Sequence, residues 1–209
     1  MTDFERPGAQ QWVPGRLSLP ALREAATGCR GCELWADATQ VVFSRGTASA
    51  RIMLVGEQPG DQEDRAGKPF VGPAGHVLAD AVDAAGIDRA DLYVTNAVKH
   101  FRFEERGTRR IHKTPETVHI VACEPWLEAE LAVVHPEVVV CLGATAGRAV
   151  FGRPVRIGAE RGSVLEARGA KAVIRNHPSA VLRLSGTPDF DAAFDALVAD
   201  LRLAAGILA

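Results

Sequence analysis

The sequence predicts a single-domain α/β protein, in which helices cover both faces of a central, mostly parallel sheet of four strands. Four short apolar runs alternate with segments of helical periodicity, the pattern of parallel strands joined by crossover helices. The chain of 209 residues is long enough for one substantial core. Its 47% apolar and 24% charged residues are typical of an ordinary globular protein. We therefore expect a three-layer α/β/α arrangement.

The first half of the chain contains two apolar runs of strand length. RIMLVG ends at a glycine, and DLYVTNAV leads into a basic segment; both suit buried strands. A Gly- and Pro-rich stretch between them predicts a long loop, and such loops in compact domains tend to be functional. The predicted elements are a helix over 18–28, a strand over 51–56, the loop over 56–75, a helix over 76–86 and a strand over 91–98.

The second half begins with a basic loop and then a helix. Thr114 as N-cap and Pro115 at the first helical position indicate where that helix starts. Two further apolar runs, EVVVCLG and KAVIRN, have strand length, and a weaker β pattern covers 163–166. The predicted elements are the loop over 99–113, a helix over 115–134, a strand over 137–143, a helix over 144–152, a strand over 171–176 and a helix over 189–203.

The N-terminal residues 1–16 are polar and contain prolines, and we expect a poorly ordered extension of a domain formed by residues 17–209. They do not show the basic region and apolar stretch of a signal peptide. No apolar run reaches the length of a membrane span. These features predict a cytoplasmic protein that does not enter a membrane.

The charge distribution bears on whether the protein could bind nucleic acid. A net charge of −2 argues against a generally basic surface for nucleic acid. The loop over 99–113 nevertheless holds six Lys and Arg residues against two Glu. Such a loop is either a solvated surface or an edge that binds phosphates.

Polar strings follow all four predicted strands. In parallel α/β sheets the ligand site lies beyond the carboxyl ends of the strands, and here those ends carry GEQPGD, NAVKH, LGATA and NHPS. GEQPG is neither a Walker A sequence nor a dinucleotide-binding G-x-G-x-x-G, which makes a nucleotide cofactor less favoured. The convergence of four strings predicts a site at this edge.

The side chains in these strings suit work on a nucleobase taken out of the helical stack. They are a carboxylate, amides, an aromatic ring, two histidines and a basic loop. The alternatives are polar turn residues, core filling by the ring, and histidines bonded to backbone. The residues are Glu57, Gln58, Phe70, Asn96, His112 and His177, with Arg109, Arg110 and Lys113 in the basic loop.

Taken together, the strings GEQPGDQED, KPFVGPAG, NAVKH, RRIHKTP and HPSAVLR resemble the uracil-DNA glycosylase superfamily. They are similar to its iron–sulfur branch, and closest to the UdgX group, whose members become covalently attached to DNA. The resemblance extends from Cys29 to the final helix. It implies that uracil-containing DNA is the substrate and uracil the released base. One substrate per chain needs no partner subunit, so a monomer is expected.

The resemblance also implies a metal site. Cys29 and Cys32 match the Cys-x-x-Cys pair of the iron–sulfur branch, Cys123 matches its helix position, and His100 stands where that branch has a further cysteine. Imidazole can replace thiolate as an iron ligand. A structural [4Fe–4S] cluster on these four residues is therefore implied. Structural zinc on the same residues is the alternative, and Cys141 is interpreted as a small buried apolar residue.

The resemblance further assigns roles around the base. His177 would donate a hydrogen bond to the uracil O2 as negative charge develops there, Asn96 would bind the uracil edge, and Phe70 would stack on the ring. His112 would capture the sugar at C1′. Glu57 would orient His112 and take or stabilise its proton, with Gln58 and Asp61 beside it.

The remaining assignments concern the DNA strand. Arg109, Arg110 and Lys113 would bind phosphates and keep His112 neutral by repulsion. Val181 and Leu182 would wedge into the base stack, and the cost of flipping predicts a preference for single-stranded DNA. Ser179 would contact a phosphate, and Gly56 and Arg183 complete the expected substrate-binding set.

Two other functions remain open at this point. One is a conventional glycosylase that turns over, with His112 as a phosphate contact only. The other is a binding module for damaged DNA without catalytic activity. A zinc-dependent deaminase is less favoured because the H-x-E…P-C-x-x-C signature is missing.

Overall fold

Within residues 6–208, which the computed structural model describes, six strands form one sheet in the order β1-β3-β2-β6-β8-β7. The central four strands are parallel and are those expected from the sequence, whereas β1 and β7 pair antiparallel at the two edges. The sheet therefore has six strands rather than four. The strands are β1 (Ser44–Arg45), β2 (Ile52–Gly56), β3 (Leu92–Asn96), β6 (Val138–Leu142), β7 (Val164–Ala167) and β8 (Ala170–Arg175).

Both edge strands are hard to predict for a physical reason. β1 has only two residues, too few to show a hydrophobic period. β7 alternates exposed and half-buried residues, and the sequence shows it only as the weak pattern at 163–166. The central strands are buried along nearly their whole length because helices cover both faces.

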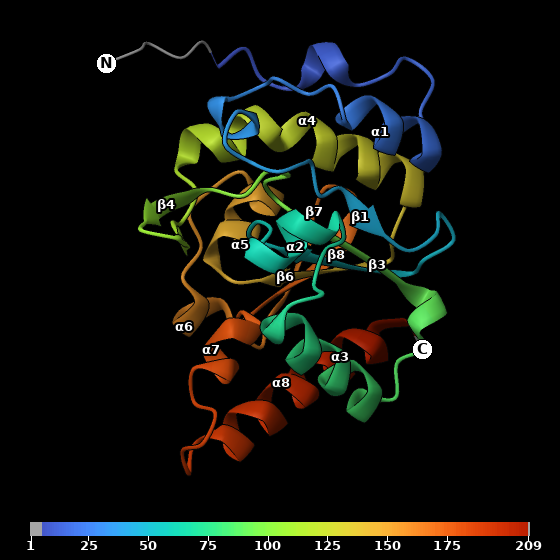
Figure 1. Cartoon of the computed structure of the whole chain (residues 1–209). Coiled ribbons are helices and arrows are strands. Elements are labelled where there is room, and N and C mark those ends of the chain that lie inside the picture. The colour runs from blue at the N-terminus through green and yellow to red at the C-terminus, as the bar shows by residue number, and fades with distance from the viewer. Residues whose placement is uncertain (1–5, 209) are drawn as a thin grey trace.

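The three layers are visible in Figure 1, with the sheet between two groups of helices. Alternate residues of the central strands serve the two faces: Met53, Val139 and Ile174 pack in one core, and Leu54 and Val140 in the other. The first core includes α1 (Leu19–Ala26), α4 (Thr117–Val134) and α5 (Ala144–Phe151), and the second includes α3 (Pro73–Ala85), α7 (Pro178–Leu182) and α8 (Phe190–Ala205).

The chain order of the parallel strands creates a switch point beside β2. β3 lies on one side of β2 and β6 on the other, so the connections leave in opposite directions. A crevice outside the carboxyl ends of the strands is the expected ligand site of such a sheet. Gly56, at the end of β2, is in register with Asn96, at the end of β3.

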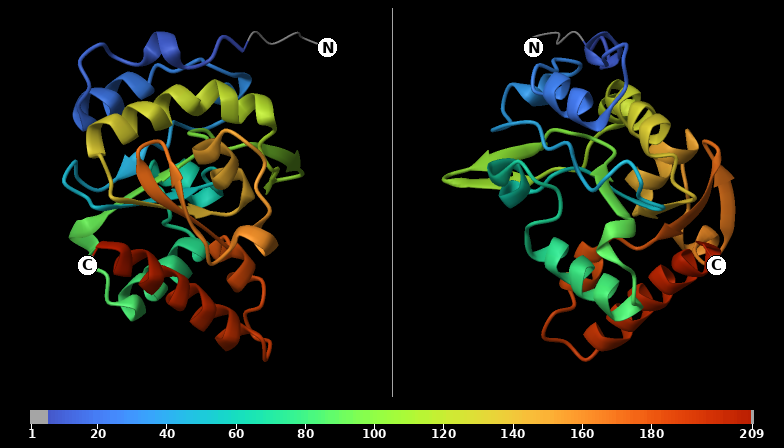
Figure 2. Two further views of the ribbon diagram at one scale, coloured as in Figure 1. Left: turned by 180° about the vertical axis from the view of Figure 1, so that it is seen from behind. Right: turned by 90° about the vertical axis from the view of Figure 1, so that its right-hand side faces the viewer.

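Two segments expected as loops contain regular structure. The long loop includes α2 (Asp61–Ala66), and the basic loop is a hairpin of β4 (Phe103–Arg106) and β5 (Arg109–His112). Gly107 supplies the positive φ of +61° at the hairpin turn. This hairpin projects from the body of the protein (Figure 2). His112 is the last residue of β5, where the returning strand pairs with Phe103 at the base of the hairpin.

The start of α4 corrects another expectation. The N-cap is Glu116 rather than Thr114, because the His119 side chain accepts the Glu116 backbone N–H and completes the cap. Pro115 therefore lies before the helix. A short helix, α6 (Ile157–Glu160), was also not predicted.

The described part of the N-terminal extension is packed onto the domain. The Ala9 N–H donates to the Ala122 carbonyl of α4 at 2.7 Å, and Ala9 is buried. Residues 6–16 thus differ from the poorly ordered extension expected for 1–16, of which 1–5 lie outside the described residues. Across residues 6–208 no helix has the length and apolar character needed to cross a membrane.

Candidate active site

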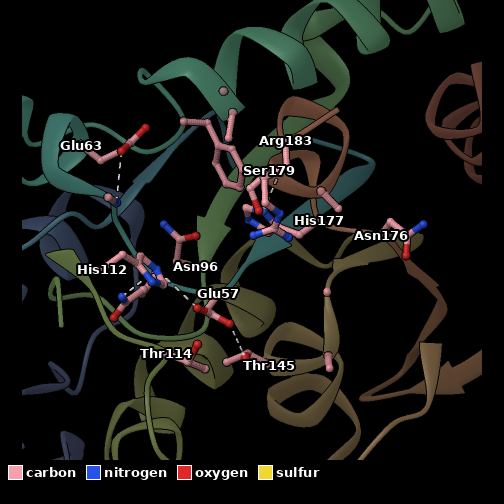
Figure 3. Close-up of a pocket in the computed structure, with 18 of the residues that line it drawn as sticks. Glu57, Glu63, Asn96, His112, Thr114, Thr145, Asn176, His177, Ser179 and Arg183 are labelled. Atoms are coloured by element: carbon pink, nitrogen blue, oxygen red, sulfur yellow. Dashed lines mark hydrogen bonds and ion pairs between the residues drawn. The ribbon is translucent and has the colours of Figure 1, made fainter. Parts of the chain in front are cut away.

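A cavity of about 800 Å³ opens at the carboxyl ends of the parallel strands. It is bounded by the ends of β2, β3, β6 and β8, by the hairpin and by α7 (Figure 3). The strand-end strings thus converge as expected. Of the expected site residues, the cavity is lined by Glu57, Gln58, Phe70, Asn96, His112, His177, Ser179 and Arg183.

Asn96 and Phe70 form one wall, and Gly56 lets them approach. Asn96 is buried at the end of β3. A Cβ on Gly56 would collide with the Asn96 Oδ1 and would lie 2.6 Å from the Phe70 ring. Phe70 itself has φ = +54°, unusual for a residue with a side chain. The absence of a side chain at Gly56 therefore leaves room for Asn96 and Phe70, although Gly56 does not line the cavity itself.

Glu63 holds the loop that carries Phe70, and sequence reasoning missed it. Its carboxylate accepts N–H bonds from Gly60, Val71 and Gly72. Three donors on one carboxylate fix the loop on both sides of Phe70. The acidic run QED after GEQPG is the signal that could have identified it.

His177 is held as a neutral imidazole in a defined tautomer. Its Nδ1 accepts the Ser179 N–H at 3.2 Å and lies 2.9 Å from the Ser179 hydroxyl. The ring proton is therefore on Nε2. Burial lowers the pKa of His177 to about 4, and the charge of Arg183 acts in the same direction. Phe70 stacks beside the ring at 6.1 Å between centroids. Ser179 thus orients His177, in addition to the phosphate contact expected of it.

The Nε2 of His112 faces two side chains from the end of β2. It lies 2.9 Å from the Gln58 amide nitrogen and 3.5 Å from the Glu57 Oε1. Figure 3 shows His112 and Glu57 side by side at the cavity wall. The other carboxylate oxygen of Glu57 accepts the Thr145 hydroxyl at 2.6 Å. Thr145 was missed individually, although the string LGATA indicates it.

Backbone contacts fix which way the Gln58 amide points. Its Oε1 accepts the Arg102 N–H at 3.0 Å, and its nitrogen lies by the carbonyls of Arg102 and Lys113. A flipped amide would lose all three contacts. The two N–H groups of this amide are shared among the carbonyls of Arg102 and Lys113 and the Nε2 of His112. Where an N–H points to Nε2, that atom presents a lone pair and the ring proton is on Nδ1.

Asp61 and Arg110 lie outside the cavity lining and bind each other. The Arg110 guanidinium contacts Asp61 at 2.5 Å and the fully buried Asp64 at 2.7 Å. Arg65 and Arg110 together lower the pKa of Asp61. Arg110 is therefore an anchor that ties the hairpin to α2, because two carboxylates already neutralise its charge. The expected roles of Asp61 beside the base and of Arg110 as a free phosphate ligand do not fit this placement.

The other two hairpin cations expected to bind phosphates differ in whether their charge is paired. Lys113 pairs with Glu104 at 2.5 Å, whereas Arg109 is exposed near the hairpin turn. The expectation that flanking cations keep His112 neutral loses much of its basis, since two of the three charges are paired.

The expected wedge into the base stack is corrected for Val181 alone. Val181 packs within the core formed with α3 and α8, so it is not free to insert into DNA. Leu182 is partly buried against the same core. Val181 therefore faces the core, whereas the insertion of the half-buried Leu182 stays a prediction.

Three of the expected metal ligands are cysteines in the core that includes α1 and α4. Cys29, Cys32 and Cys123 are free, buried, and members of one core cluster. The Trp126 indole N–H donates to the Cys29 sulfur, and the Lys99 N–H donates to the Cys123 sulfur, both at 3.3 Å. Donors of this kind stabilise thiolate ligands. Cys141 is buried in β6, as expected of an apolar residue.

The fourth expected ligand is placed less clearly. His100 is buried, but the charges that act on its ring are those of Asp64 and Arg30. Within residues 6–208 no group of three or more His, Cys, Asp or Glu side chains is arranged to hold a metal ion. The donor chemistry of the three thiols fits a metal cofactor, and the position of His100 leaves its part in the ligand set a prediction.

Comparisons with known proteins agree with this site. The sequence profile of the Uracil DNA glycosylase superfamily matches residues 43–202. The chain is 39% identical to the type-4 uracil-DNA glycosylase of Thermotoga maritima, over 79% of this chain and 83% of the relative. It is 33% identical to the type-4 enzyme of Sulfurisphaera tokodaii (75% and 67% covered) and 32% to that of Pyrobaculum aerophilum (80% and 86%). The chain belongs to the uracil-DNA glycosylase superfamily.

Proposed function

We propose that the chain excises uracil from DNA and is then captured through a covalent bond between His112 and C1′ of the sugar. The observation that carries the proposal is the position of the His112 Nε2, in one cavity with Glu57, Asn96 and His177. The type-4 names of the relatives support the excision step. The capture step rests on the geometry around His112 and on the resemblance to the UdgX group.

Recognition of the base is assigned to the cavity wall formed by Asn96 and Phe70. The Asn96 side chain presents an amide to the base edge, which distinguishes uracil from cytosine by its donor and acceptor pattern. The Phe70 ring supplies a face for stacking, and Glu63 holds its loop in place. This wall would bind a flipped uracil.

Cleavage of the glycosidic bond leaves negative charge on the base and positive charge on the sugar. The His177 tautomer suits the first charge, because its Nε2–H can donate to the uracil O2 while the ring stays neutral. The Glu57 carboxylate suits the second charge. Its bond from Thr145 holds it in place beside His112.

Capture follows from the lone pair on the His112 Nε2. As the bond between C1′ and the uracil N1 breaks, its electron pair leaves with the base, and Nε2 forms a new bond to C1′. The imidazole then carries positive charge, which Glu57 stabilises at 3.5 Å. The Nδ1 proton is released to solvent, to which the half-exposed ring has access. Glu57 thus stabilises charge, and water replaces it as the proton acceptor.

The adduct should persist because, once the Nδ1 proton is lost, its departure would have to expel an imidazolate anion, which leaves poorly. In retaining glycosidases the covalent intermediate is a carboxylate ester, which water hydrolyses. An N-linked sugar without a protonated leaving group lacks that route. Each protein chain would therefore excise one uracil and then remain attached to the DNA.

The three buried thiols support a structural [4Fe–4S] cluster, with His100 proposed as the fourth ligand. Such a cluster would tie Cys29 and Cys32 to α4 and fix the segment that leads into the hairpin, without a part in the chemistry. Iron, sulfide and zinc should be measured in protein purified without air. Four irons and four sulfides per chain support the cluster; one zinc per chain supports the alternative.

The conventional glycosylase is the competing function, and it is favoured by the type-4 relatives. Released uracil should be counted per chain, for the natural protein and for His112→Ala, on single-stranded and duplex DNA. We expect one uracil per natural chain, single strands reacting faster, and release above one per chain for His112→Ala as water replaces the imidazole. Many turnovers by the natural protein would contradict capture, and no release by either protein would leave only a binding module.

A further inference from the structure

A second cavity, of about 530 Å³, lies between α1, β1 and the end of α2. We infer that it binds a nucleotide of the DNA strand that flanks the target, through a phosphate and a stacked base. This inference rests on the proposed function, because it gives the substrate a second point of contact. The residues that would bind the strand are Arg23, Arg30 and Trp35, which come from α1 and from the segment that follows it.

The first support is charge. In the described part of the chain, two arginines line the cavity, and no Asp or Glu does. Neither Arg23 nor Arg30 has an ion-pair partner within residues 6–208, although Arg6, Arg65 and Arg110 nearby each have one. In a chain of net charge −2, a hollow with unpaired guanidinium groups favours an anion.

The second support is an unmet hydrogen-bond donor. Arg23 donates through one terminal nitrogen to the Gly46 carbonyl at 3.0 Å, while its Nε is buried and has no partner among the described residues. Buried donors normally have partners. The other terminal nitrogen of Arg23 also has no partner among the described residues and is not buried, so a phosphate oxygen could bind it.

The third support is a stacking platform. The Arg30 guanidinium lies 4.0 Å from the centre of the Trp35 ring, and the Arg30 side chain also donates to the Cys29 carbonyl. Trp35 is 40% exposed, a large fraction for a tryptophan. Aromatic rings and arginines on a cationic groove are the means by which proteins bind single strands without reading sequence.

Position links this cavity to the active site. Gly60, before α2, lines the first cavity, and Gly67, after α2, lines the second. α2 has six residues and a length of about 9 Å, so the two cavities lie at the two ends of one short helix. Thr39, in the wall of the second cavity, accepts a hydrogen bond from the Arg110 that anchors the hairpin. One strand could therefore contact both cavities.

The test uses the full chain and single strands that carry one uracil. Strands are extended stepwise on the 5′ or the 3′ side, and the excision rate at limiting substrate is compared with Arg30→Ala/Trp35→Ala. We expect the excision rate of the natural protein to rise as the strand is lengthened on one side of the uracil only. The variant should match it on the shortest strand and be about tenfold slower on the longest. The salt dependence of log rate should be shallower for the variant by about 0.7.

Three controls make the result interpretable. Arg30→Lys/Trp35→Phe keeps a charge and a ring and should retain most of the length effect. Arg202→Ala removes one positive charge from α8, remote in sequence from the cavity, and should have no effect on it. Equal iron content in all proteins shows that the neighbouring Cys29 is undisturbed.

Two results would overturn the inference: a variant with the same length dependence as the natural protein, or an equal loss at every length, which indicates a structural role. If the natural protein excises no uracil from any strand, the proposed function fails separately. Binding of a labelled uracil-free strand, followed by fluorescence anisotropy, then still tests the cavity. An unchanged dissociation constant in the Ala variant would overturn the inference, whereas a tenfold weaker one would support it.

Discussion

The Gln58 amide nitrogen lies 2.9 Å from the Nε2 of His112, and three backbone contacts fix that amide in place. In the proposed mechanism this contact orients the His112 ring, whose Nε2 forms the bond to C1′. It also links the end of β2 to the hairpin, since the amide holds the backbone of Arg102 and Lys113. The predictions below depend on these contacts and on those that support them.

Gln58→Glu should separate capture from excision. The new carboxylate would accept a proton from the His112 Nε2 and so occupy the lone pair. We expect adduct formation to fall by about tenfold or more, with a smaller fall in uracil release. Gln62→Glu adds the same charge at an exposed position of α2 and serves as the control. Equal adduct yields from both variants would show that the Gln58 donor is unimportant.

Gly56→Ala should damage recognition without unfolding the protein. The added Cβ would displace Phe70 and Asn96, with which it would collide. A displacement of about 1 Å can cost roughly a hundredfold in rate. Single-turnover excision measures the loss, and Gly15→Ala, where a Cβ meets nothing within 4 Å, should react normally. A normal rate for Gly56→Ala would mean that the two side chains do not form the base-binding wall.

Arg110→Ala should destabilise the protein, whereas Arg65→Ala should not. Both arginines bind Asp61, but only Arg110 also pairs with the fully buried Asp64. Removal of one partner of a buried pair costs about 3 kcal/mol, and an exposed pair contributes below about 1 kcal/mol. Urea unfolding gives both values, and similar stability losses would contradict the anchoring role.

His177 should make stability depend on pH in a defined window. Its pKa is about 4 in the folded protein, below the ordinary 6.5, so the unfolded chain binds a proton that the folded chain does not. The stability from the neutral ring is complete above pH 6.5 and declines towards pH 4. The unfolding free energy of the natural protein minus that of His177→Asn should fall by about 1–2 kcal/mol from pH 7 to 4.5. His76→Asn, at an exposed site, should show no such trend; a constant difference for His177→Asn would mean that its pKa is not lowered.

The sequence was informative where burial is complete. The central strands are apolar along their length and end in polar strings, so both the fold and the location of the cavity could be predicted. β1, β7 and the hairpin lie at edges or in solvent, where neither period nor burial gives a strong pattern. α2 was hidden because its sequence, DQEDRA, is polar on all sides.

The chemistry at the site was predictable by residue type and less so by contact. Glu57, Asn96 and His177 meet in one cavity, as their strand ends indicated, and His112 joins them from the hairpin. Arg110, however, looked like a phosphate ligand because its partner Asp64 is 46 residues distant in sequence. Pairing across such separations depends on tertiary structure, which local charge patterns do not report.

The most direct test of the account is a denaturing gel of the protein with a labelled single strand containing one uracil. We predict a uracil-dependent band at the summed mass of protein and DNA, absent with a thymine control and with His112→Ala. Mass spectrometry of its peptides should place the sugar on His112. A natural protein that releases uracil and leaves a free, alkali-labile strand would contradict covalent capture and identify a glycosylase that turns over.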